Sequence, residues 1–165
     1  NLFKAEFFKK GGKWNTNLKS SQEYELMFNF LKSDNNKIVF DKEIKTIIRK
    51  RNSGSISQTN YEKNWERYVQ IRVDILNYLV KTSAKIDMSS AYQILFDSIR
   101  TLYSYAPIKA INYFEHNIPK GFVPNTSIAT GKSYVFLYKF LGFKKTEKIR
   151  MYITSGLKKL GHWYT

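Results

Sequence analysis

The chain has 165 residues, 42% of them hydrophobic and 16% aromatic, and its 28 Lys and Arg residues against 13 Asp and Glu give a formal net charge of +15. Such a composition excludes disordered and collagen-like chains. The sequence contains no Cys, which excludes disulfides, thiol catalysis and Cys-ligated zinc. No apolar run reaches the length of a membrane span, so we expect no integral membrane segment.

Residues 1–58 are predicted to form an N-terminal mixed subdomain with a basic edge. Gly11 and Gly12 lie within residues 2–18 and suit the tight turn of a β-hairpin, so a small β element is expected there. Residues 20–33 favour a helix, although their apolar residues also alternate as in a strand. Residues 41–51 are predicted to form a short helix.

Residues 59–165 are predicted to form a helical domain that follows a polar, small-residue boundary at 52–58. Apolar spacings of three and four predict helices over 61–81 and 90–103. Pro107 is expected to open a third helix, because Pro is tolerated at the first helical position. A loop should follow.

The C-terminal segment is predicted to contain two helices, 133–141 and 146–160, joined by a short link that begins with Gly142. This order resembles a helix-turn-helix, with residues 162–164 as a short closing strand of a wing. The predicted fold class is therefore α+β and predominantly α-helical, with a C-terminal helix-turn-helix or winged-helix-like segment.

Charge is unevenly distributed, since residues 121–165 contain eight Lys and Arg residues but a single acid, Glu147. A basic surface without compensating acids favours binding to the phosphates of nucleic acid. The second helix is expected to enter the major groove of duplex DNA, with Arg150 able to pair with guanine. The predicted nucleic-acid-binding residues of this segment are Lys132, Lys144, Lys145, Thr146, Lys148, Arg150, Lys158 and Lys159. A second predicted basic cluster is formed by Lys45, Arg49, Lys50 and Arg51.

Alternatives to duplex DNA binding follow from the same sequence. The basic face could be a solvated helical surface, or it could bind RNA, another protein or an anionic membrane surface. Asp34, Glu43 and Lys45 have a spacing that fits a Mg²⁺-dependent nuclease. The segment from Ala129 to Ser133 is similar to the end of a phosphate-binding loop, but Thr126 stands where that motif needs Gly.

No catalytic residue, metal ligand or cofactor is predicted within this segment. Because the first residue is Asn1, we expect a recognition domain of a larger protein, with neighbouring domains as further partners. A chain without Cys fits a reducing compartment, which predicts a cytoplasmic, nucleoid or nuclear location.

Overall fold

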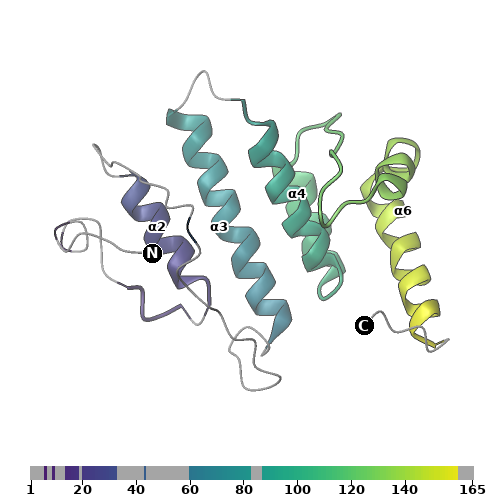
Figure 1. Ribbon diagram of the computed structural model, residues 1–165, viewed down its shortest axis with the longest axis horizontal. Helices are drawn as coiled ribbons and strands as arrows, with labels where there is room; N and C mark the ends of the chain where they lie inside the picture. Colours follow the sequence, from purple (N-terminus) through teal and green to yellow (C-terminus); the bar gives the residue numbers. More distant parts are fainter. Residues whose placement is uncertain are drawn as a thin grey trace. The chain divides into compact units, whose positions relative to one another are not determined.

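The computed structural model describes Glu6, Lys9, Glu43 and residues 14–18, 20–32, 60–82 and 87–159, and Figure 1 shows the helices they form. The chain divides into two compact units, Asn1–Arg67 and Tyr68–Thr165. The described part is all-α and contains no strand. Glu6 and Lys9, within the segment predicted as a β-hairpin, have helical conformation. The predicted wing strand, the boundary at residue 58 and, apart from Glu43, the predicted helix at 41–51 lie outside the described residues.

Helix α2 spans Gln22–Lys32 and confirms the predicted helix. Leu26 and Phe30, four residues apart, are its buried side chains, whereas Tyr24 is exposed. That spacing fits a helical period and not the alternation of a strand, which resolves the ambiguity of the sequence. Within the same unit, Glu25 pairs with Arg67 at 3.4 Å.

Helix α3 spans Tyr61–Thr82 and begins at a polar cap. The side-chain oxygen of Asn60 accepts a hydrogen bond from the backbone N–H of Lys63 at 3.3 Å. Asn60 has a φ of 50°, a left-handed conformation that Asn tolerates better than most residues. Its contact satisfies one of the N–H groups that a helix start leaves without an intrahelical partner.

Helices α4 (Ser89–Tyr103) and α5 (Pro107–Asn117) pack against each other and confirm both predictions. Ser104, Tyr105 and Ala106 separate them, and Ala106 has φ −144° and ψ 75°, outside the helical region that is disfavoured for the residue before a proline. Pro107 then occupies the first turn of α5, where its missing N–H costs nothing. Pro119 follows the end of α5 and begins the irregular segment that reaches α6.

An aromatic core holds the second unit together around Phe96 of α4, which is fully buried. Other rings surround Phe96 with centroid distances of 5.5 to 6.2 Å and tilted or edge-on geometry, the favoured arrangements for aromatic pairs. These rings belong to Phe114, Phe122, Tyr134, Tyr138 and Phe143. Phe114 of α5 also stacks on Phe143 with centroids 4.3 Å apart, so α4, α5 and α6 share one core.

Helix α6 spans Lys132–Lys159 and bends at Gly142, so that its two arms run in clearly different directions (Figure 1). We call residues 132–141 the first arm and residues 143–159 the second arm. Gly142 has φ 69° and ψ 179°, a region that essentially only glycine occupies. The sequence correctly placed a break here, but the predicted link of several residues is wrong. One glycine redirects the chain, and the helix resumes at Phe143.

Candidate nucleic-acid interface

A buried ion pair joins α4 to the second arm of α6. Arg100 is 6% exposed and Glu147 is fully buried, and Arg100 Nε donates to Glu147 Oε1 at 2.7 Å. The Arg100 guanidinium also lies over the Tyr134 ring, 3.5 Å from its centroid. Burial of a charge is costly unless the charge is paired and hydrogen-bonded, so each of these groups depends on the others.

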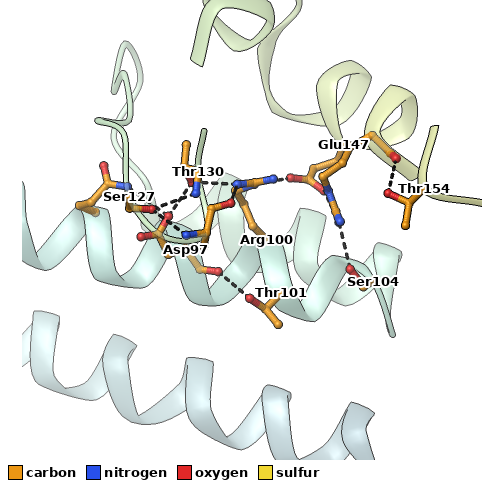
Figure 2. Close-up of polar contacts among 11 residues, drawn as sticks. Asp97, Arg100, Thr101, Ser104, Ser127, Thr130, Glu147 and Thr154 are labelled. Carbon is orange, nitrogen blue, oxygen red and sulfur yellow. Dashed lines mark hydrogen bonds and ion pairs between the residues drawn. The ribbon is translucent and has the colours of Figure 1, made fainter. Parts of the chain in front are cut away.

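Arg100 also fixes the loop that precedes α6, as Figure 2 shows. Its Nη1 donates to Thr130 Oγ1 at 2.8 Å and to the Ala129 carbonyl oxygen. Thr130 in turn donates to Asp97 Oδ1 at 2.7 Å, which returns the chain of contacts to α4. The loop and the start of α6 are therefore held to α4 by polar contacts as well as by the aromatic core.

The second carboxylate oxygen of Glu147 is occupied by Arg150. Arg150 Nε donates to Glu147 Oε2 at 2.7 Å, and Arg150 Nη2 donates to Ser104 Oγ at 3.0 Å (Figure 2). Glu147 thus faces two guanidinium groups and has no oxygen directed to solvent. Arg150 is engaged in this network while its side chain is 28% exposed, and its predicted pairing with a base stays a prediction.

Tyr134 lies beside the same carboxylate at the start of α6. Burial, and then the negative charge of Glu147, hold the pKa of the Tyr134 hydroxyl far above its usual value. The phenol therefore stays neutral at physiological pH and lines the network as an uncharged group.

Burial of Glu147 has a direct effect on the outer surface of α6. Glu147 is the single acid of residues 121–165, and its charge is matched inside the fold by Arg100 and Arg150. The exposed surface of α6 therefore carries lysine side chains, while the one acidic side chain of this helix is buried.

Three of these cations share one face of the second arm, which we call the lysine face: Lys144, Lys145 and Lys148. Spacings of three and four residues place such side chains next to each other on a helix. Tyr152, 68% exposed, continues the same face one turn further along. Lys144 Nζ contacts Glu115 at 2.6 Å, but both side chains are about half exposed, and such surface pairs are weak enough to exchange for another anion.

The remaining predicted site residues do not belong to the lysine face. Lys132 is exposed at the start of the first arm, away from the lysine face in sequence. Thr146, predicted as the first residue of a helix, is 1% exposed and instead lies within the second arm of α6. The side chains of the other predicted residues lie outside the described part: Lys45, Arg49, Lys50, Arg51, Lys158 and Lys159.

Sequence reasoning missed two features of this surface. Glu147 was counted only as the lone acid of a basic segment, and that isolation was the available signal that it is matched internally. Phe136 and Phe140 fall within the predicted helix at 133–141, and the sequence analysis did not single them out, yet they are 63% and 73% exposed. Their separation by four residues, with Lys132 and Lys139 at neighbouring helical positions, was the signal that they form a surface of their own.

The described residues include no cluster of metal-ligating side chains and no helix long and apolar enough to cross a membrane. No protein-family model matches the chain, and the comparisons with curated proteins and with solved structures also give no match.

Proposed function

We propose that the chain binds nucleic acid, specifically duplex DNA, through the lysine face of α6. The observation that supports this is the burial of Glu147, which leaves Lys144, Lys145 and Lys148 exposed on a helix without an exposed acid. Such cations bind the phosphate backbone and release its counterions, which is the main source of sequence-independent affinity.

The proposed contacts are to phosphates and not to bases. A lysine acts as a point charge and suits phosphate, whereas bidentate base recognition uses the planar fork of arginine. Arg150, the arginine expected for that purpose, is engaged by Glu147 and Ser104. The proposal is therefore binding with little sequence preference, in place of the base readout that the sequence suggested.

Duplex DNA is favoured over duplex RNA by the shape of the presenting element. The lysine face belongs to a regular helical arm, and the major groove of B-DNA admits an α-helix. The deep, narrow major groove of A-form RNA does not admit side chains in the same way.

Paired charge reversals test the proposal. Lys145→Glu with Lys148→Glu should weaken binding to a labelled duplex DNA by about 30-fold, or about 2 kcal/mol, because two phosphate contacts become repulsive. Lys63→Glu with Lys81→Glu, two exposed lysines of α3, is the matched control with the same change in net charge.

Fluorescence anisotropy titrations at one salt concentration, with circular dichroism to verify folding, give the comparison. Equal losses in the two double variants would contradict the proposal, because affinity would then follow net charge alone. A larger loss with duplex RNA than with duplex DNA would assign the lysine face to RNA.

A further inference from the structure

Two phenylalanines of α6 are exposed side by side. Phe136 is 63% exposed and Phe140 is 73% exposed, and their ring centroids are 5.0 Å apart. The planes of the two rings are 58° apart, so the rings are tilted and not stacked on each other. Exposed aromatic side chains in contact with each other form an apolar patch, which is the kind of surface feature that marks a binding site.

Lysines flank this pair on the same side of the first arm. Lys132 and Phe136 are one helical turn apart, and so are Phe136 and Phe140. Lys139, three residues after Phe136, is next to Lys132 around the helix axis, on the side of Phe136 away from Phe140. All four side chains are exposed. The opposite side of the arm presents Tyr134 and Tyr138 to the aromatic core, so the outward direction of the Phe pair is fixed by packing. We call Lys132, Phe136, Lys139 and Phe140 the stacking face.

We infer that the stacking face binds single-stranded nucleic acid, with unpaired bases on the Phe136 and Phe140 rings and phosphates on Lys132 and Lys139. Aromatic rings with cations beside them are the usual means of holding a single strand, because every base offers a flat face and every nucleotide a phosphate. This inference rests on the proposed nucleic-acid binding and adds to it a second ligand class, since paired bases in a duplex cannot reach the rings.

Charge disfavours a second copy of this chain as the occupant of the stacking face. The chain has a formal net charge of +15, and pairing two such faces would bring Lys132 and Lys139 of each copy against like charges. An anionic membrane is also a poor match, because a helix that binds a bilayer buries one long apolar face. Here two rings are available, and the other face of the first arm is occupied by the core.

The double variant Phe136→Leu with Phe140→Leu tests the inference, since it keeps apolar side chains on an exposed surface while removing both rings. Affinity for labelled oligothymidylate should fall about 30-fold, as expected for the loss of two base-stacking contacts. Affinity for a blunt duplex DNA should stay within about twofold of the unmodified chain. Tyr24→Leu with Tyr105→Leu, two other exposed aromatic residues, is the control and should leave both affinities unchanged.

Ultraviolet cross-linking to oligothymidylate, with mass spectrometry of the peptides, provides a second readout and should place the cross-link at Phe136 or Phe140. An unchanged affinity for oligothymidylate in the Phe double variant would overturn the inference and leave the lysine-face proposal intact. So would an effect of that variant only on anionic vesicle binding or on self-association in sedimentation. Failure of the unmodified chain to bind any nucleic acid would overturn both.

Discussion

Glu147 shows how one residue determines what a basic segment presents to solvent. Its carboxylate is directed into the fold and accepts hydrogen bonds from Arg100 and Arg150. Arg100 lies 47 residues away along the chain, so no local pattern in the sequence could have identified Arg100 as the partner of Glu147. The same carboxylate engages Arg150, the arginine that the sequence had assigned to base recognition.

Removing this carboxylate should destabilise the fold strongly. Glu147→Gln leaves the buried Arg100 guanidinium without a counter-charge, and breaking a buried pair in this way costs about 3 to 5 kcal/mol. Glu115→Gln, which removes the exposed partner of Lys144, should change the free energy of unfolding by less than about 1 kcal/mol. Urea unfolding followed by circular dichroism measures both. Similar small decreases in the free energy of unfolding of the two variants would show that the buried network contributes little to stability.

At the level of the elements, the sequence predicted the helices whose signals are local. The apolar spacing of α3 and α4 and the proline at the start of α5 lie within each helix, and all three helices are confirmed. For α6, the glycine at position 142 was recognised as a break, but not its geometry. A link of several residues and a single glycine in an unusual conformation produce similar sequence patterns, and tertiary packing decides between them.

Gly142→Ala should destabilise the chain by about 1 to 3 kcal/mol, because the conformation at Gly142 is strained for any residue with a Cβ atom. No neighbouring atom lies within 4 Å of the added Cβ position, so the cost would come from the backbone alone. Gly156→Ala is the matched control in the second arm. This helical glycine also has open space around it, and the change should stabilise by about 0.5 to 1 kcal/mol. Thermal unfolding of both variants gives the comparison, and effects of the same sign would contradict this account of the bend.

The positive charge of the candidate site could be predicted from the sequence, but the direction in which each of its side chains points could not. The excess of lysine in residues 121–165 was visible in the sequence, and Lys144, Lys145 and Lys148 are exposed as expected. Thr146, only a few positions away, is buried, and Arg150, whose side chain is 28% exposed, is engaged by Glu147 and Ser104. Which positions of a helix face the core depends on where its neighbours pack, and that information is spread over α4, α5 and the loop before α6.

At the scale of the whole molecule, the central claim concerns where the charges of the C-terminal segment lie. The lysines of the lysine face are exposed to solvent, whereas the single acid of the segment, Glu147, is buried in the fold. A net charge of +15 would attract any polyanion diffusely, whereas an exposed lysine face should bind phosphates at defined positions. These two situations differ in how individual lysines contribute to the salt dependence of binding.

The slope of log affinity for duplex DNA against log salt concentration tests this claim most directly. Neutralising Lys145 and Lys148 by Lys→Gln substitutions should reduce the magnitude of that slope by about 1.8, since each phosphate contact contributes about 0.9. Neutralising Lys63 and Lys81 in the same way should leave the slope unchanged. A slope that changes equally in the two double variants, or in neither, would contradict a defined lysine face on α6.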